Sequence, residues 1–535
     1  MKTISRLLLV SMTFLAAASI FAQNPYLPLW EFIPDGEPYV FEDPDNPGQY
    51  RVYVYGSHDN LVTMYCGLDQ VVWSASVDDL RHWRYDGVIF ESKQDAQGKN
   101  LHPDGKGDVL FAPDVNEVIG KDSTKTYYLY PNNQAGGRQT MVARSSRPDG
   151  PFEVCNWSPD HPTQTVGILG FDPAVFTDTD GRTYAYWGFG QSNGAELDPA
   201  TMATVKPGTQ IVENMIPGYR QDHTYRFFEA SSMRKIEDKY VFIYSRVTND
   251  GEDGLPGCNY TLAYCYGNSP LGPWTYGGTI IDGRGKEHRP DGCTVATATP
   301  FGNTHGSICK IGDQWYVFYH RQAGTDEYGR QAMVAPIRVE VVSGEDGYVR
   351  ISEAEFTSEG FLTEGLDPYE TYPAGIACYY MGPEPATQDY PNVHYSGSHT
   401  AIVRNQYDGT SDPYTVGMNR CPMVNNTAGS VVGYKYYYFG RTFGQAGLQL
   451  VLDYTPDGTS GAIDFFLDRP TEAEGGVHLA TLLVEGEGIG QPTTANIELE
   501  QLKYYNGKHA LFLVFSSEIA KQSICQLNYL HFEKK

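Results

Sequence analysis

Five ionisable side chains recur at equivalent places in the first part of the chain. Each lies a short and similar distance before a tyrosine of a strand-like run, and the five are Asp35, Asp114, Asp172, Glu229 and His305. A single Asp at such a place is commonly a turn residue, because its side chain accepts hydrogen bonds from nearby backbone amides. Five such groups need another reason, since gathered carboxylates repel one another unless function or a metal requires them. The spacing therefore indicates a shared polar site.

Grouped carboxylates are the side chains that glycoside hydrolysis requires. One carboxylic acid protonates the departing oxygen, and one ionised carboxylate activates water or attacks the anomeric carbon. Crowding keeps the acid protonated near neutral pH, because a neighbouring negative charge raises its pKa. The sequence has no nucleophile motif, phosphate-binding loop or zinc-ligand spacing that would indicate another chemistry. The set therefore favours hydrolysis of a neutral sugar polymer.

The tyrosines belong to a β-type run that returns five times, and this repeat must position the five groups. The first and last intervals between these markers are nearly equal, and the two middle intervals are shorter and identical; the markers are Tyr53, Tyr128, Tyr184, Tyr240 and Tyr316. Such runs between Gly or Asp turns are typical of strands, and long helical patterns are absent from the sequence. Repeats of this period stack four-stranded blades around an axis. We therefore predict a five-bladed β-propeller whose axial channel receives the five groups.

A second set of strand signals follows the repeat. The segment from Pro368 to Pro373 is interpreted as a short connection, and later strands alternate with Gly and Asp turns, as in a β-sandwich. We therefore predict an all-β chain, with a propeller catalytic domain over residues 23–365 and a jelly-roll-like β-sandwich over residues 374–535.

The N-terminal segment has the pattern of a secretory signal. Lys2 and Arg6 precede an apolar run from Leu7 to Ile20, and Ala22 is a small residue suited to cleavage. No later stretch approaches the roughly 18 apolar residues of a membrane span. We therefore expect a signal peptide over residues 1–22, a secreted or periplasmic protein and no membrane span.

The charge balance restricts the partners. Sixty-five acidic and 39 basic residues give a net charge of −26, which repels nucleic acid but not a neutral polysaccharide or oligosaccharide. The nine cysteines include no C-x-x-C pair, so no zinc or thioredoxin signature is present. Disulfide pairing and oligomeric state stay open.

Four segments, in this order along the chain, resemble glycoside hydrolase family 43. They surround Asp35, Phe171–Gly181, Phe228–Ser232 and His305–Ser307, and the resemblance extends over roughly residues 25 to 360. It implies a five-bladed propeller that hydrolyses with inversion and needs no cofactor for chemistry. It also implies that Asp35 is the general base, Glu229 the general acid, and Asp172 the carboxylate that raises the pKa of the acid and orients it. Inversion places base and acid roughly 6.5 to 9.5 Å apart to admit a water.

The other two ionisable groups and one arginine have less defined expectations. Asp114 is predicted to bind a substrate hydroxyl or support the site, with a structural turn as the alternative. His305 resembles the axial histidine of the family, which lies beside calcium or water; a structural Ca²⁺ near it would have mainly water and oxygen ligands, and a purely structural histidine is the alternative. Arg321 is predicted to contact a substrate hydroxyl or a catalytic carboxylate, with a structural salt bridge as the alternative.

Aromatic side chains are candidates for stacking on a sugar ring. Trp73 and Phe228, together with Trp30, fall near predicted channel-mouth loops, and packing in the core is the alternative for each.

The resemblance favours α-L-arabinofuranosidase or β-xylosidase activity on side chains of plant cell-wall polysaccharides. A β-galactosidase, galactanase or endo-arabinanase of the same family is an alternative, as is a propeller that binds carbohydrate without catalysis. A retaining propeller hydrolase of fructans or sialic acids is a further rival. The segments 507–515 and 527–532 resemble a family 6 carbohydrate-binding module, but its acidic opening strand is not evident at Ile376–Tyr379. The C-terminal domain is therefore expected either to bind sugar or to support the propeller.

Overall fold

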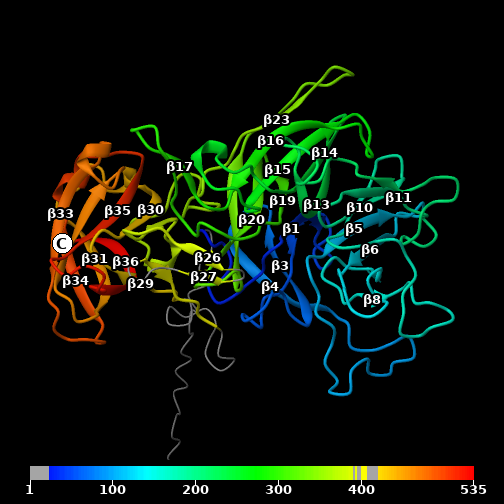
Figure 1. Ribbon diagram of the computed structural model, residues 1–535, viewed down its shortest axis with the longest axis horizontal. Coiled ribbons are helices and arrows are strands. Elements are labelled where there is room, and N and C mark those ends of the chain that lie inside the picture. Colours follow the sequence, from blue (N-terminus) through cyan, green and yellow to red (C-terminus); the bar gives the residue numbers. More distant parts are fainter. Residues whose placement is uncertain (1–22, 390–391, 395–398, 407–419) are drawn as a thin grey trace, which may run out of the picture.

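The computed structural model describes residues 23–389, 392–394, 399–406 and 420–535 (Figure 1). The signal peptide predicted over residues 1–22 lies outside them. Within these residues the chain is all-β, and its helices are short 3₁₀ turns: η1 (Glu252–Gly254), η2 (Ala374–Ile376), η3 (Phe439–Arg441), η4 (Glu472–Glu474) and η5 (Glu500–Tyr504).

Five antiparallel sheets follow one another along the chain as blades. The first contains β1 (Glu37–Glu42), β2 (Tyr50–Tyr55), β3 (Asp69–Ser76) and β4 (Asp79–Glu91). The second contains β5 (Asp114–Ile119), β6 (Lys125–Tyr130), β7 (Ala143–Ser145) and β8 (Glu153–Val154). The third contains β9 (Ala174–Thr177), β10 (Thr183–Trp187), β11 (Asn193–Glu196) and β12 (Val212–Glu213). The fourth contains β13 (Phe227–Ile236), β14 (Lys239–Arg246), β15 (Thr261–Gly267) and β16 (Thr275–Asp282). The fifth has three strands, β19 (Ser307–Ile311), β20 (Gln314–Gln322) and β21 (Arg330–Ile337).

The first strands of the blades form the wall of the axial channel. Strand β9 contacts both β5 and β13, β13 contacts β19, and β19 contacts β1, so the fifth blade lies beside the first. The marker tyrosines all fall on the second strand of a blade: β2, β6, β10, β14 and β20. The repeat therefore marks blades as expected, and the five-bladed propeller is confirmed. Two hairpins lie outside the blades, β17 (Lys286–His288) with β18 (Thr294–Ala296) and β22 (Val339–Val341) with β23 (Val349–Ile351).

Apolar side chains fill the space between neighbouring blades. Phe41 and Tyr53 of the first blade pack with Tyr127 and Leu129 of the second in one buried cluster. Comparable clusters lie between the other blades. Many of the abundant tyrosines serve this packing, because aromatic and β-branched side chains fit pleated surfaces.

Two further sheets form the C-terminal β-sandwich. One contains β28 (Ala401–Ile402), β29 (Met423–Asn426), β36 (Cys525–Lys534), β31 (Leu448–Pro456) and β34 (Thr493–Glu498), with β24 (Tyr372–Pro373) paired to β36. The other contains β25 (Tyr379–Met381), β30 (Val431–Tyr438), β35 (Lys508–Ser516), β32 (Gly461–Leu467) and β33 (Val477–Val484). A small hairpin, β26 (Thr387–Asp389) with β27 (Asn392–His394), accompanies them. Leu450, Ile463 and Leu511 from the two sheets share one buried cluster, so the sheets pack face to face.

The β-sandwich packs against the fourth and fifth blades, on the side of β17 and β20 (Figure 1). Val241 of β14, Tyr319 of β20 and Tyr434 of β30 belong to the same buried cluster. The two parts of the chain therefore share one continuous apolar core.

Among the described residues, no helix is long and apolar enough to cross a membrane. All nine cysteines are described, and each carries a free thiol.

Candidate active site

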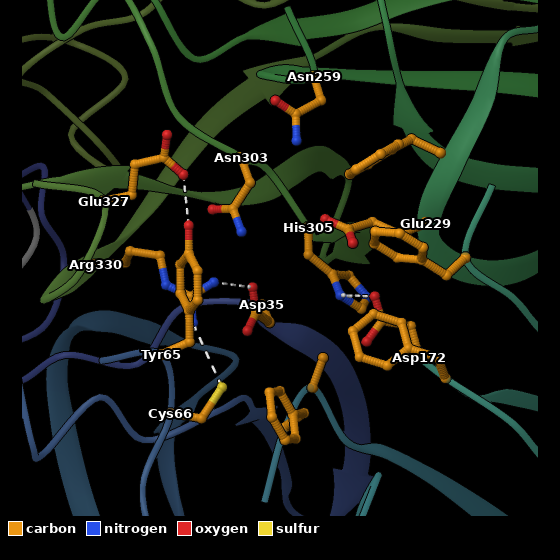
Figure 2. Close-up of a pocket in the computed structure, with 15 residues that line it drawn as sticks. Asp35, Tyr65, Cys66, Asp172, Glu229, Asn259, Asn303, His305, Glu327 and Arg330 are labelled. Atoms are coloured by element: carbon orange, nitrogen blue, oxygen red, sulfur yellow. Dashed lines mark hydrogen bonds and ion pairs between the residues drawn. The ribbon is translucent and has the colours of Figure 1, made fainter. Parts of the chain in front are cut away.

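A cavity of about 290 Å³, lined by both aromatic and ionisable side chains, lies where the channel-facing loops of the blades meet (Figure 2). Asp35, Asp172, Glu229 and His305 all line it. They come from the first, third, fourth and fifth blades, at or just before the first strand of each. The structure thus brings together four of the five groups that the spacing predicted.

Asp35 lies two residues before β1 and is held by hydrogen bonds from several directions. Its Oδ2 accepts from Ser57 Oγ at 2.5 Å, and its Oδ1 accepts from Arg330 Nη1 at 3.0 Å. Burial alone would raise the pKa of this carboxyl, but the Arg330 charge and the Ser57 hydrogen bond hold it below its ordinary value. Asp35 is therefore an ionised carboxylate at neutral pH.

His320 supports Asp35 as a neutral imidazole. Burial lowers the pKa of His320 to about 3. Its Nδ1 accepts from the backbone N–H of Asp35 at 3.2 Å, so its proton is on Nε2, which lies 2.9 Å from the carbonyl oxygen of Asn303. The backbone at Asp35 is left-handed, with φ of 61°, and these contacts hold that conformation.

Glu229 has the opposite electrostatic environment. It lies on β13 between two shifts of the register with β14, and the next residue, Ala230, has φ of 67°. The irregularity interrupts the regular alternation of the strand at the point where the carboxyl group enters the cavity. Burial, Asp172 and Asp35 raise the pKa of Glu229 well above its usual range. These groups therefore favour the protonated form of Glu229, in contrast to Asp35.

Asp172 connects these two groups. Burial raises its pKa to about 6, with His305 opposing and Asp35 reinforcing the shift. Its Oδ1 accepts from Asn132 Nδ2 at 2.8 Å, and its Oδ2 accepts from the backbone N–H of Ala230 at 3.2 Å. Asp172 thus contacts the bulge beside Glu229 and adds negative charge there.

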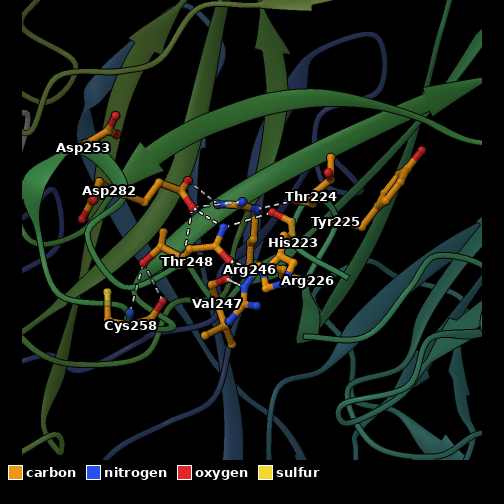
Figure 3. A network of polar contacts seen from close by, with 12 residues as sticks. His223, Thr224, Tyr225, Arg226, Arg246, Val247, Thr248, Asp253, Cys258 and Asp282 are labelled. Atoms are coloured by element: carbon orange, nitrogen blue, oxygen red, sulfur yellow. Dashed lines mark hydrogen bonds and ion pairs between the residues drawn. The ribbon is translucent and has the colours of Figure 1, made fainter. Parts of the chain in front are cut away.

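A polar network fixes the loop that leads into β13 (Figure 3). Arg246 Nε donates to the carbonyl of Thr224 at 2.8 Å, and its Nη1 pairs with Glu252 at 2.6 Å. Arg226 Nε donates to the carbonyl of Val247 at 2.6 Å. Because Glu229 follows this loop closely in the sequence, the network helps to set where its carboxyl group enters the cavity.

His305 Nδ1 lies 3.7 Å from Asp172 Oδ2. In the part of the chain that the structure describes, no group of three or more His, Cys, Asp or Glu side chains is arranged to hold a metal ion. A calcium ion near His305 would therefore need mainly water ligands.

Asp114 does not line the cavity, contrary to its predicted contact with substrate. Its Oδ1 accepts from Tyr39 Oη at 2.7 Å, and its Oδ2 accepts from the backbone N–H of Val175 at 2.6 Å. These partners lie on β1 and β9, so Asp114 ties three blades together. Its contacts are structural, but Asp114 is the first residue of β5 and not the turn residue that was the alternative.

Arg321 also lies away from the cavity. Its guanidinium is fully buried and donates to the backbone carbonyls of Gly375 and Ala377 at 2.5 and 2.8 Å, and to Gln331. Arg321 therefore joins the propeller to the C-terminal domain, and the predicted contact with substrate or a catalytic carboxylate is wrong.

The arginine of the cavity is Arg330, one strand further along the same blade. Arg321 pairs with Gln331 across β20 and β21, whereas Arg330 pairs with Gln322. Adjacent pairs point to opposite faces of a sheet, so the one-residue offset sends the two guanidinium groups to different sides. The sequence signal for Arg330 was its place at the start of the strand that follows the fifth marker.

The three aromatic candidates have different outcomes. Trp30 packs against the apolar cluster of the first and fifth blades and does not line the cavity. Trp73 is fully buried, with Nε1 donating to Glu31 Oε2 at 2.9 Å, and it does not line the cavity. Its predicted stacking on sugar is wrong, because β3 lies in the interior of its blade. Phe228 lines the cavity, where its ring packs 4.9 Å from that of Phe189.

Several further residues line the cavity that the strand repeat does not indicate: Tyr65, Cys66, Phe111, Phe171, Phe189, Asn259, Asn303, Glu327 and Arg330. Phe171 adjoins Asp172 in the segment already singled out, so its proximity could have been inferred. Most of the others lie on loops of different lengths between strands, where no repeat indicates which side chain faces the axis.

Glycoside hydrolysis requires one carboxyl group that favours the ionised form and one that favours the protonated form, and the axial cavity of this propeller holds such a pair. The model of glycosyl hydrolases family 43 matches residues 40–341, more than half of the chain. Asp172, Glu229 and His305 lie within the match, and Asp35 lies just before it. The chain belongs to glycoside hydrolase family 43.

The chain is 33% identical over 432 residues to a xylosidase/arabinosidase of Thermoclostridium stercorarium, covering 77% of this chain and 82% of that protein. It is 29% identical over 302 residues to an arabinoxylan arabinofuranohydrolase of Bacillus subtilis, covering 51% and 54%. Among solved structures, a family 43 arabinoxylan arabinofuranohydrolase from Bacillus subtilis in complex with cellotetraose aligns with 97% of this chain and 99% of its own, at 19% identity and a TM-score of 0.43.

Proposed function

We propose that the protein is an inverting glycosidase of the α-L-arabinofuranosidase or β-xylosidase type, acting on side chains of plant cell-wall polysaccharides. The observation that carries the proposal is the electrostatic contrast between Asp35 and Glu229 in one cavity. An enzyme that protonates a leaving oxygen and activates water needs two carboxyl groups whose pKa values are moved apart. The similarity to a xylosidase/arabinosidase and an arabinoxylan arabinofuranohydrolase supports the sugar class.

In this proposal Asp35 accepts a proton from the attacking water. Arg330 and Ser57 keep its carboxylate ionised and aimed into the cavity. Glu229 donates its proton to the departing glycosidic oxygen. Asp172 raises the pKa of Glu229 and fixes the adjacent backbone. The water then bonds to the anomeric carbon as the C–O bond to the leaving group breaks, which inverts the configuration.

The cavity also has an apolar side. Three phenylalanines line this side: Phe171, Phe189 and Phe228. The ring centroid of Phe189 lies 5.5 Å from that of Phe171 and 4.9 Å from that of Phe228. The C–H faces of a pentose pack favourably on such rings, whereas its hydroxyl groups need the polar side chains opposite.

The test is hydrolysis of aryl α-L-arabinofuranosides, β-D-xylosides and β-D-galactosides, with the product anomer followed by NMR. We expect inverted arabinose or xylose as the first product. Glu229→Gln and Asp35→Asn should each lose roughly 100-fold or more in kcat on natural linkages, the usual range for removal of a general acid or base. Asp114→Asn, which changes a buried carboxylate outside the cavity, is the matched control. Product of retained configuration, or full activity of Glu229→Gln, would refute the proposal.

The alternative activities of the family each have a separate test. Preferred release of galactose would favour a β-galactosidase or galactanase, internal cleavage of linear arabinan would favour an endo-arabinanase, and binding without release would favour a non-catalytic propeller.

We also propose export directed by residues 1–22, a water-held calcium near His305 and family 6-like sugar binding by the C-terminal β-sandwich. N-terminal sequencing of the exported protein tests the proposed export. A change of Tm on adding a chelator tests the calcium site, and retention of the Glu229→Gln protein on insoluble arabinoxylan tests sugar binding.

A further inference from the structure

One wall of the cavity is a hydrogen-bonded pair from two different loops. Tyr65 Oη donates to Glu327 Oε2 at 2.5 Å, and both residues line the cavity. Tyr65 lies between β2 and β3, and Glu327 lies between β20 and β21. Figure 2 shows the pair on one side of Asp35, with Asp172 and Glu229 on the other. Tyr65 and Glu327 thus lie opposite Glu229, the proposed general acid, across the cavity in which the sugar would bind.

Both loops are held by one arginine of the C-terminal β-sandwich. Arg404 follows β28, and its Nη1 and Nη2 lie 2.7 and 2.9 Å from the two carboxylate oxygens of Asp326, the neighbour of Glu327. Arg404 Nη1 also donates to the carbonyl of Val62 at 3.1 Å, in the loop that carries Tyr65. A bidentate arginine pair fixes direction as well as distance.

The loop of Glu327 is shaped around the Arg404 side chain. Gly324 and Gly329 flank the loop with φ of 97° and 60°. A Cβ at Gly324 would lie 2.9 Å from Arg404 Nε, and one at Gly329 would lie 2.6 Å from Arg404 Cδ. The loop therefore packs directly against the Arg404 side chain, which leaves little space for a Cβ at either glycine.

We propose that Arg404 is a positioning residue for substrate binding, through which the C-terminal β-sandwich completes the propeller's cavity. By holding the two loops together, Arg404 places the Glu327 carboxylate to accept a hydrogen bond from a hydroxyl group of the bound glycoside. The inference rests on the proposed glycosidase function. In this proposal Glu327 binds the sugar in the ground state and in the transition state alike. Its displacement therefore weakens both binding steps together, which raises KM more than it lowers kcat.

The first test compares Arg404→Ala with Arg469→Ala. Arg469 also joins the β-sandwich to the propeller side, with Nη1 2.7 Å from Glu287 Oε1, but Glu287 does not line the cavity. For the aryl glycoside that the parent enzyme hydrolyses best, we expect Arg404→Ala to raise KM roughly tenfold, the size of effect expected from losing one hydrogen bond to the bound sugar. Its kcat should change by less than about threefold, and Arg469→Ala should keep the parent KM. Arg404→Lys, which keeps charge but not the bidentate pair, should fall between.

A second variant keeps the test informative if Arg404→Ala does not fold. Asp326→Asn removes the same pair from the propeller side and should raise KM similarly, and the double variant Arg404→Ala/Asp326→Asn should add little, as expected for two partners of one interaction. An unchanged KM in a folded Arg404 or Asp326 variant would overturn the inference, as would an equal rise in Arg469→Ala. Neither result bears on the acid and base, whose roles depend on the Glu229 and Asp35 variants.

Discussion

Arg330 pairs with two buried carboxylates at once, Asp35 through Nη1 and Asp59 through Nε and Nη2. The Nη1 contact to Asp35 measures 3.0 Å, and both contacts to Asp59 measure 2.9 Å. Asp59 anchors the guanidinium, so that its remaining nitrogen is directed at the proposed base. The ionisation of Asp35 therefore depends on a residue from the far end of the propeller sequence.

Replacement of Arg330 should change the pH profile. The positive charge lowers the pKa of Asp35, so Arg330→Gln should raise that pKa and move the acidic limb of the kcat/KM profile to higher pH. The unpaired Asp59 should also lower the free energy of unfolding by about 3–5 kcal/mol, the usual cost of breaking a buried ion pair. Arg330→Lys, which keeps a charge, should shift the limb less. An unmoved acidic limb in a folded Arg330→Gln protein would contradict this account.

Replacement of Asp172 should shift the alkaline limb of the pH profile. Its negative charge raises the pKa of Glu229, so Asp172→Asn should lower that pKa and shift the alkaline limb of kcat/KM to lower pH. Glu327→Gln should shift it in the same direction by less, because Glu327 makes a smaller contribution to the pKa of Glu229. Steady-state rates across the pH range measure both. A shift to higher pH in either variant would show that the sign is wrong.

Asp114 should affect stability and its pH dependence rather than KM. Burial and the nearby Glu37 raise the pKa of Asp114 to about 7, above the unfolded value of about 3.9. The folded protein therefore binds more protons between these values than the unfolded chain, so this group's contribution to stability falls as pH rises from about 4 to about 7. Asp114→Asn does not titrate, so the parent should lose stability relative to the variant across that window. Thermal unfolding at pH 5 and pH 7.5 measures the difference, and an unchanged difference would exclude the raised pKa.

Arg321 should contribute to stability through the contact between the two domains. Arg321→Ala removes the donor to the carbonyls of Gly375 and Ala377 and leaves buried acceptors unsatisfied, at about 1–3 kcal/mol for each such group. We expect a lower Tm in calorimetry and an unchanged KM at temperatures where the variant is folded. Arg441→Ala, at an exposed pair with Asp367, is a control that should change Tm little. A raised KM for Arg321→Ala would mean that the contact reaches the cavity.

The strand repeat was enough to predict the blades and the phase of the catalytic groups. Each marker tyrosine lies on the second strand of a blade, so an ionisable residue a short distance before it must lie near the first strand, beside the axis. Asp35, Asp172, Glu229 and His305 accordingly line one cavity. Asp114 does not, because the first residue of β5 points between blades, toward Tyr39 and Val175.

The sequence by itself determined the all-β architecture, the number of blades and the carboxyl groups that converge, because strand periodicity and repeat spacing are local properties of the chain. Only the tertiary structure decided which side chains complete the site. Arg321 and Arg330 lie on opposite faces of the same sheet, and only one of these faces meets the cavity. The loops of Tyr65 and Glu327 lie near opposite ends of the propeller sequence but meet at Arg404. Such contacts depend on how loops of irregular length and a second domain pack around the axis, and no spacing in the sequence encodes that packing.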